Sequence, residues 1–169
     1  GFTVSEDGNT YYAAIDGKVE YCNYDLRIVN VLDISGDVDL NIGNIDFNGD
    51  VNITGNVITG VTIRAMGSIY IGGYVEGAVI KSNKDIVLNK GVNANGIGQI
   101  EAKGNISARF FENAIVYAEG DVNAGYILSS KIMALGKVIV QGSRGTIHGG
   151  DVTGVMGIET SNAGNASYA

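Results

Sequence analysis

Short segments in which apolar and polar residues alternate recur along the chain from residue 45 onward. Six of them share the pattern apolar-x-small-x-Gly-x-apolar-x-apolar, so that positions 1, 3, 7 and 9 are apolar or small. They begin at Ile45, Ile63, Ile80, Ile100, Val116 and Ile132. Alternation with a period of two is typical of β-strands that bury one face. Each segment therefore predicts two short strands joined by a sharp corner.

The segments follow one another at nearly regular intervals. Their starts lie 18, 17, 20, 16 and 16 residues apart, and the fifth position is glycine in five of the six copies, with Lys84 as the exception. We expect these glycines to adopt unusual backbone angles at the corner, and the small third residue to pack inside the bend. A stacked unit of 16–20 residues predicts a single-stranded parallel β-helix (β-solenoid) of about six to eight rungs, a rung being one full turn.

The first 42 residues lack this repeat. Two β-prone runs flank Asp16-Gly17, a pair that favours a two-residue hairpin turn, and LRIVNVLDI supplies a further strand. We therefore divide an all-β, single-domain chain into a β-rich N-terminal cap or lead-in (residues 1–42), a parallel β-helix (43–160) and an irregular C-terminal tail (161–169).

Composition supports a packed β protein and excludes several other classes. The 169 residues include 26 glycines and are 45% hydrophobic, but proline is absent. Glycine-rich disordered or collagen-like chains normally contain proline, whereas proline inside a stacked rung would remove a ladder hydrogen bond. The single cysteine, Cys22, can form neither an internal disulfide nor a cysteine zinc site. We expect it to be a small strand residue rather than a nucleophile.

The chain is acidic, and its charge is uneven. The formal net charge is −7, of which residues 1–60 contribute −8 and residues 61–169 contribute +1. No cluster of lysine and arginine predicts a nucleic-acid interface. No apolar run is long enough for a transmembrane helix, and the first residues lack the order of a signal peptide. We therefore expect a cytoplasmic protein without a nucleic-acid partner or membrane insertion.

Several longer segments carry a family resemblance. They are GDVDLNIGNIDFNGDVNITGNV (36–57), IRAMGSIYIGGYVEGAVI (63–80), IEAKGNISARFFENAIVYAEGDV (100–122) and SRGTIHGG (143–150). In this order they resemble the central β-helical region of the flagellar assembly protein A family, and similar solenoids occur in bactofilins and in the C-terminal domain of the septum inhibitor MinC. The resemblance implies a right-handed parallel β-helix and a bacterial cytoplasmic scaffold or assembly module without enzymatic activity.

His148 is the only histidine and the first candidate for chemistry. It could be the general base of a hexapeptide-repeat acyltransferase, which is also a β-solenoid enzyme. Apolar residues at intervals of six favour that interpretation, but the register then slips, because later rungs of 16 residues do not divide by six. The alternative is an ordinary outward-facing or turn histidine.

Four aspartates, Asp37, Asp39, Asp46 and Asp50, form the second candidate. Stacked carboxylates could bind calcium or supply the acid and base of a polysaccharide-cleaving β-helix. The glycine-rich nonapeptide of calcium-binding β-rolls is missing, however. The alternative is that these aspartates sit at corners because their side chains accept hydrogen bonds from nearby backbone amides.

The sixth repeat differs from the others at its outward-facing positions. Met133, Leu135 and Ile139 make it apolar on both strands, although an exposed solenoid wall does not need them. One hypothesis is a docking patch for a partner, a second copy or a missing segment, and the alternative is that a loop of the same chain covers the three residues.

Two classes of function remain open after these observations. The first is a non-enzymatic scaffold or assembly module that binds a protein partner, or a second copy of itself, through its walls or its stackable ends. The second is a solenoid enzyme of the acyltransferase or carbohydrate-active type that uses His148 or the clustered aspartates. We expect the scaffold, with no catalytic residue, metal or cofactor.

Overall fold

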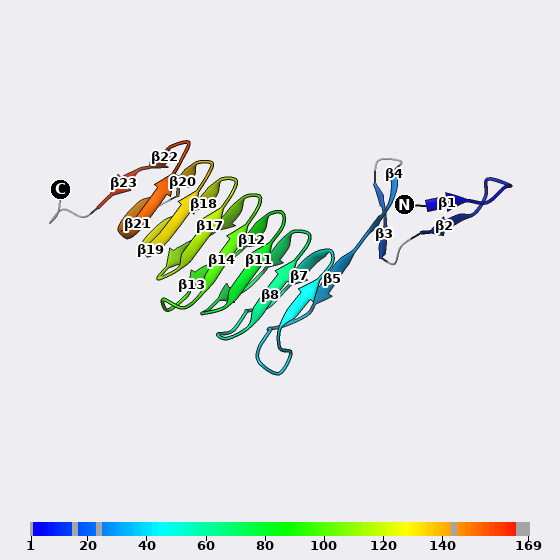
Figure 1. Ribbon diagram of the computed structural model, residues 1–169, viewed down its shortest axis with the longest axis horizontal. Helices are drawn as coiled ribbons and strands as arrows, with labels where there is room; N and C mark the ends of the chain where they lie inside the picture. The colour runs from blue at the N-terminus through cyan, green and yellow to red at the C-terminus, as the bar shows by residue number, and fades with distance from the viewer. Residues whose placement is uncertain (1, 15–16, 23–24, 143–144, 165–169) are drawn as a thin grey trace.

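The computed structural model describes residues 2–14, 17–22, 25–142 and 145–164. Every regular element in these ranges is a β-strand. From Val31 onward the strands wind into a parallel β-solenoid of about 7 turns, and two small hairpins lie beyond its N-terminal end (Figure 1). The predicted all-β parallel β-helix is therefore confirmed, as is the number of rungs.

The strands of successive rungs form three parallel walls. Wall 1 contains β5 (Val31–Ile34), β7 (Asp50–Ile53), β9 (Ile69–Ile71), β12 (Ile86–Leu88), β15 (Ile106–Ala108), β18 (Val122–Ala124), β20 (Val138–Val140) and β22 (Ile158–Thr160). Wall 2 contains β6 (Ile45–Phe47), β8 (Thr62–Ala65), β11 (Val79–Ser82), β14 (Gln99–Ala102), β17 (Ile115–Ala118) and the C-terminal parts of β19 (Tyr126–Ala134) and β21 (Thr146–Gly154). Wall 3 contains β10 (Tyr74–Val75), β13 (Gly91–Asn93), β16 (Phe111–Glu112), the N-terminal parts of β19 and β21, and β23 (Asn162–Ala163).

The register of wall 2 confirms the repeat alignment. Each predicted copy pairs through its first residue with the first residue of the next copy, in the order Ile45, Ile63, Ile80, Ile100, Val116 and Ile132. The series continues to Val152, which begins a seventh copy, VTGVMGIET. The sequence pattern did not identify this copy, because Met156 occupies the position that is usually glycine.

The alternation of the repeats produces a continuous core along the solenoid axis. The seventh position of the six copies is completely buried in every rung, and the small third residue is buried from Ala65 onward. The largest buried side chain is Phe111 on wall 3. Each rung therefore contributes one layer of the core and contacts only the layers before and after it.

The glycines at the fifth position do not have the backbone angles expected from the sequence. None of Gly49, Gly67, Gly104, Gly120 and Gly136 has a φ in the left-handed region, so that expectation is wrong. Instead, a Cβ on Gly136 would collide with Oδ1 of Asp121 in the preceding rung. These glycines are needed for close approach between rungs and not for an unusual conformation.

The N-terminal region is arranged differently from the prediction. β1 (Phe2–Val4) pairs with β2 (Tyr11–Ala13), and β3 (Lys18–Cys22) pairs with β4 (Asp25–Val29). The predicted hairpin across Asp16-Gly17 is wrong in its pairing, because β2 and β3 do not pair, and Asp16 itself lies outside the described residues. The same dipeptide type at Asp7-Gly8 makes the first turn, where Gly8 has φ +73°.

The solenoid also extends past both predicted boundaries. β5 already pairs in parallel with β7, so the first rung begins at Val31, inside the segment assigned to the cap. At the other end β23 pairs with β21, so residues 162–163 of the predicted irregular tail belong to the ladder. Residues 165–169 of that tail lie outside the described residues.

Candidate functional site

The corner between wall 2 and wall 1, here called the glycine corner, is closed by hydrogen bonds between rungs. Oδ1 of an aspartate or asparagine just after the corner accepts a hydrogen bond from the backbone N–H at the same position of the next rung, at 2.7–2.8 Å. The acceptors are Asp50, Asp85, Asn105 and Asp121. The polar side chains of this corner therefore stabilise the stacking of rungs.

Three of the four candidate aspartates accept hydrogen bonds from backbone amides, two of them between rungs. Asp50 accepts from Ser68 N, and Asp37 accepts in the same way from Asn56 N at 2.6 Å. Asp39 accepts from two amides of its own loop, and these bonds, above all that from the Ile42 N–H, lower its pKa below the usual 3.8. Asp46 is exposed on wall 2. For Asp37, Asp39 and Asp50, the interpretation as backbone acceptors is confirmed.

His148 lies far from these aspartates along the solenoid axis. It is an exposed residue of β21, in register with Leu128, and it lines neither of the two cavities described below. Asp37 and Asp50 belong to the first two rungs, at the opposite end of the solenoid. Among the described residues, no group of three or more His, Cys, Asp or Glu side chains is placed to hold a metal ion.

The three residues of the predicted apolar patch do not share one wall. Met133 is 43% exposed on wall 2, Leu135 is 39% exposed at the glycine corner, and Ile139 is half-buried on wall 1. Met133 and Leu135 are thus open to solvent, whereas Ile139 lines a groove on the neighbouring face. The docking role of the three residues stays a prediction.

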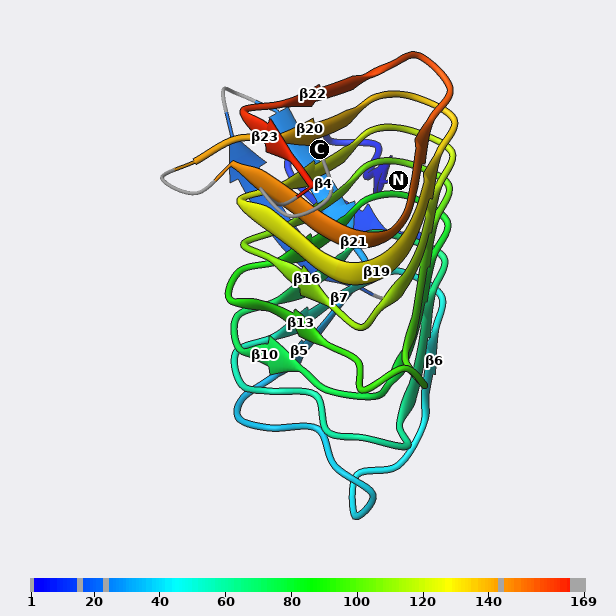
Figure 2. The ribbon, with the colours of Figure 1, turned by 90° about the vertical axis from the view of Figure 1, so that its left-hand side faces the viewer.

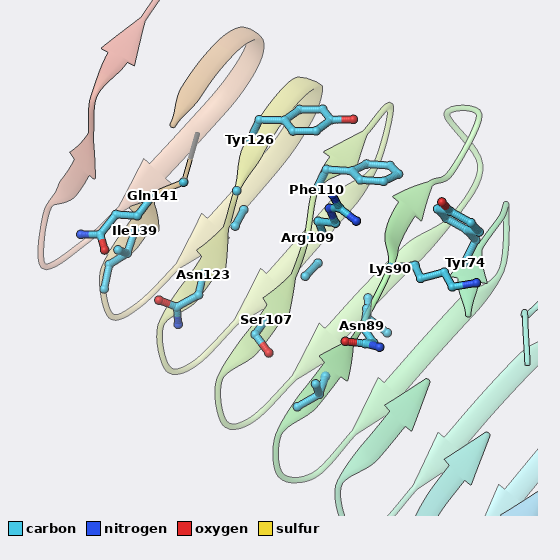
Figure 3. A pocket seen from close by; sticks show the side chains of 16 residues that line it. Tyr74, Asn89, Lys90, Ser107, Arg109, Phe110, Asn123, Tyr126, Ile139 and Gln141 are labelled. Atoms are coloured by element: carbon cyan, nitrogen blue, oxygen red, sulfur yellow. The ribbon is translucent and has the colours of Figure 1, made fainter. Parts of the chain in front are cut away.

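That groove, here called the axial groove, is the larger of the two hollows described here. It has a volume of about 860 Å³ and follows the corner between wall 1 and wall 3, here called the groove corner (Figure 3). Its wall 1 side consists of the outward-facing residues Val87, Ser107, Asn123 and Ile139, which lie in register on successive rungs. Asn89, Lys90, Arg109 and Gln141 line the corner itself.

A stack of aromatic side chains forms the other side of the axial groove. The rings of Phe110 and Tyr126 lie nearly parallel, with centroids 5.1 Å apart, and Tyr74 lies 6.3 Å from Phe110. The Tyr126 hydroxyl donates a 2.8 Å hydrogen bond to Glu112. Lys90 Nζ lies 5.2 Å from the centroid of the Tyr74 ring, within the range of a cation–π contact.

Glycine is essential at one point of this stack. In register, Gly91 lies between Tyr74 and Phe110, and the Phe110 ring covers it so closely that a Cβ would approach Phe110 Cδ1 to 2.6 Å. Gly91 also has φ +117°, which side chains rarely allow. The aromatic stack was not predicted. It would have been visible if the repeats had been aligned beyond their ninth position, where Tyr74, Phe110 and Tyr126 follow at two or three residues.

The charge of the axial groove differs from that of the whole chain. Its lining contains the two cations Lys90 and Arg109 and no carboxylate, whereas the chain has a net charge of −7. Since no acid lines it, the groove lacks the carboxylate pair that glycoside hydrolysis requires.

The second cavity lies at the C-terminal end of the solenoid. It has a volume of about 510 Å³ and is lined by core-facing residues of the last rung, among them Ile147, Val152, Ile158 and Ala163. Viewed from this end, β21, β22 and β23 form the outermost rung (Figure 2).

No helix in the described part of the chain is long and apolar enough to cross a membrane.

Comparison with known proteins gives one match. The family model for the flagellar assembly protein A beta solenoid domain matches residues 30–168. The match begins one residue before β5, where the solenoid itself begins. Neither the search of curated proteins nor that of solved structures finds a match.

Proposed function

Because this chain belongs to the flagellar assembly protein A family, whose β-solenoid domain covers residues 30–168, we propose that it is a non-enzymatic structural module of the bacterial cytoplasm that works by protein–protein contact. Membership of the family makes it a structural module related to flagellar assembly. The surface that we assign to the contact is the C-terminal end of the solenoid, and the occupant that we assign to it is a second copy of the chain.

The observation that carries this proposal is the exposure of core positions in the last rung. Ile158 continues the inward-facing column of Val122 and Val138, which are completely buried, yet it is 44% exposed. Ile147 and Val152 are only partly buried for the same reason. A solenoid rung buries its apolar side chains only when another layer covers it, so this end favours contact with a further apolar layer.

The backbone at this end supports the same proposal. Among the described residues, no strand pairs with the outer edge of β22 or β23. Unpaired N–H and C=O groups on a sheet edge readily pair with another chain. A partner that stacks on the last rung would satisfy these groups and bury Ile158 at once.

Light scattering after size-exclusion chromatography tests the proposal over a range of protein concentrations. We expect a dimer or larger assembly for the unmodified chain and a monomer for Ile158→Asp, because a carboxylate in the stacked layer would lose its hydration. The matched control is Thr153→Asp, an exposed position on wall 2 in the same rung. A chain that is monomeric at all concentrations, or equal assembly of both variants, would contradict self-association through this end.

A further inference from the structure

The axial groove differs in shape from the cavity at the solenoid end. The groove runs along several rungs, whereas that cavity is confined to the last rung. Its lining extends from Tyr74, on the rung of β9 to β11, to Gln141, which follows β20. Four rung spacings of about 4.8 Å separate these positions, giving a length of roughly 19 Å. At about 3.3 Å per residue, this length accommodates roughly six residues of extended polypeptide.

Five polar side chains of the groove can bind a ligand without breaking a hydrogen bond of the protein. Within the described residues, the side chains of Asn89, Ser107, Arg109, Asn123 and Gln141 make no hydrogen bond to the protein. Elsewhere on wall 1, polar side chains bond across rungs, as Asn52 does to Asp33 and Lys137 does to Glu159. The unpaired donors and acceptors of these five groove side chains can therefore pair with the backbone groups of a peptide.

The aromatic side of the groove favours a peptide over a glycan. A sugar ring stacks on an open aromatic face, but Phe110 and Tyr126 each turn one face toward the other, and Lys90 lies over the Tyr74 ring, so these three faces are already in contact. These rings line one side of the groove, and Val87 and Ile139 add apolar side chains on its wall 1 side. Such a surface suits aliphatic or aromatic side chains of an extended segment.

The charge of the groove indicates that its ligand is negatively charged. Lys90 and Arg109 stand in the groove without a carboxylate beside them in its lining, and Arg109 makes no ion pair among the described residues. Arginine binds carboxylates through two parallel hydrogen bonds, and unpaired cations in a groove steer acidic partners toward it. From shape, free polar groups and charge together, we propose that the axial groove binds an extended acidic segment of a partner protein.

This inference rests on the proposed function, because it names the chemistry of a protein partner for the same module. It differs from β-strand addition, since the strands that line the groove already share their backbone hydrogen bonds with neighbouring rungs. Binding in the groove therefore depends on side chains alone. The two contact surfaces are independent, one on the long face and one at the C-terminal end.

Fluorescence anisotropy with labelled six-residue peptides tests the groove on the full chain. The probe alternates glutamate with leucine, and its counterpart carries lysine in place of glutamate. We expect the acidic probe to bind, the basic one not to bind, and the double variant Lys90→Glu with Arg109→Glu to weaken binding at least about tenfold. The matched control is Lys103→Glu with Lys131→Glu, which makes the same charge change at two exposed lysines outside the groove.

The outcomes separate this proposal from the preceding one. Equal affinity of the groove variant and the control variant, or no binding of the acidic peptide, would overturn the groove proposal. Binding of an acidic oligosaccharide such as oligogalacturonate in place of the peptide would overturn it as well. Light scattering of the Ile158→Asp variant reports on the solenoid end, so either surface can fail without the other. Circular dichroism of both double variants confirms that the fold is retained.

Discussion

The glycine corner and the groove corner each turn the chain from one wall to the next but are built from different residues. At the glycine corner, a side-chain oxygen of one rung accepts a backbone hydrogen bond from the next, from Asp50 to Lys137. The groove corner begins in the same way, since Asp37 bonds to Asn56 N and Asn56 bonds to Tyr74 N. From Tyr74 onward, however, aromatic rings and cations replace these acceptors.

The difference shows which polar residues stabilise the scaffold and which remain available for binding. Where the corner is closed by hydrogen bonds, Oδ1 of each acceptor side chain is bound to a backbone N–H of the next rung. Where the acceptors are missing, Arg109 and the amides make no side-chain hydrogen bond among the described residues, and Lys90 contacts only the Tyr74 ring. We infer that, over four rungs, the groove corner lacks the side-chain hydrogen bonds that stabilise the stacking elsewhere and presents the proposed binding surface in their place.

The glycine corner also follows a pairing rule. The fifth position of a repeat is glycine when the preceding rung carries Asp or Asn at the sixth position, as for Gly67, Gly104, Gly120 and Gly136. It is Lys84 where the preceding rung has Ser68, and Met156 where that rung has Lys137. A glycine is thus needed where a bonded oxygen would occupy the space of its Cβ.

The largest effect on stability is expected at a glycine of the glycine corner. Gly136→Ala would drive its Cβ into Asp121 Oδ1 and should lower the free energy of unfolding by about 1–3 kcal/mol, the usual cost of overpacking. Urea unfolding followed by circular dichroism measures the change. Lys84→Ala is the control, because that position already has a Cβ. If Asp121→Ala does not reduce the cost of Gly136→Ala in a double-mutant cycle, the pairing rule is wrong.

The next effect is the loss of one bond between rungs. Asp121→Ala leaves the Lys137 N–H without its 2.7 Å acceptor and should cost about 1–2 kcal/mol of unfolding free energy. Asp121→Asn should cost much less, because Asn105 makes the same bond one rung earlier with its amide oxygen. The urea midpoints of the two variants provide the measurement. Equal losses would mean that the negative charge, and not the acceptor, stabilises this corner.

A smaller effect on stability is expected at the groove corner. Phe110→Ala removes the stacked ring beside Tyr126 and should cost about 1 kcal/mol, because the ring is only partly buried. The thermal midpoint and the near-ultraviolet circular dichroism of the tyrosines measure the loss. A cost above that of Gly136→Ala would show that the aromatic stack is a main support of the solenoid, and the contrast between the corners would disappear.

The smallest effect is electrostatic and depends on pH. Lys137 donates a 2.7 Å hydrogen bond to Glu159, and this bond raises the pKa of the exposed Lys137 ammonium above its ordinary value of 10.5. A raised pKa means that the bond stabilises the fold below pH 10.5 and that this contribution is lost as the pH rises through the folded-state pKa. Glu159→Gln should therefore lower the unfolding midpoint slightly at neutral pH and have no effect at strongly alkaline pH. A difference that grows with pH would contradict this assignment.

The fold could be predicted from the sequence because the apolar positions that define the repeat are the same residues that form the core. Positions with a period of two fix which side chains point inward, and the spacing of copies such as Ile100 and Val116 fixes the register of the ladder. Local reasoning failed at Asp16-Gly17, because a favourable turn pair cannot tell which strands will pair. It also failed for the glycine angles, because a collision between rungs involves residues that are distant in sequence.

The candidate site was harder to predict from the sequence, because its contacts also join residues that are distant in sequence. The aromatic stack joins Tyr74, Phe110 and Tyr126 from three rungs, and each of these rungs supplies only one of the rings. Met133 and Ile139 looked like neighbours on one surface, but the glycine corner between them turns them toward different walls. A surface site on a solenoid becomes visible only after the rungs have been placed in register.

The pairing of Asp121 with Gly136 has a consequence for how such chains change over evolutionary time. Neither residue can be replaced alone without a cost, whereas replacing both removes the bond together with the collision at Asp121 Oδ1 and leaves only the close approach of the new Cβ to the Gly120 backbone. Relatives of this chain should therefore show covariation between positions in neighbouring repeats, with the acceptor and the glycine gained or lost as a couple. That signal would mark the stacking register in sequences whose apolar repeats have drifted beyond alignment.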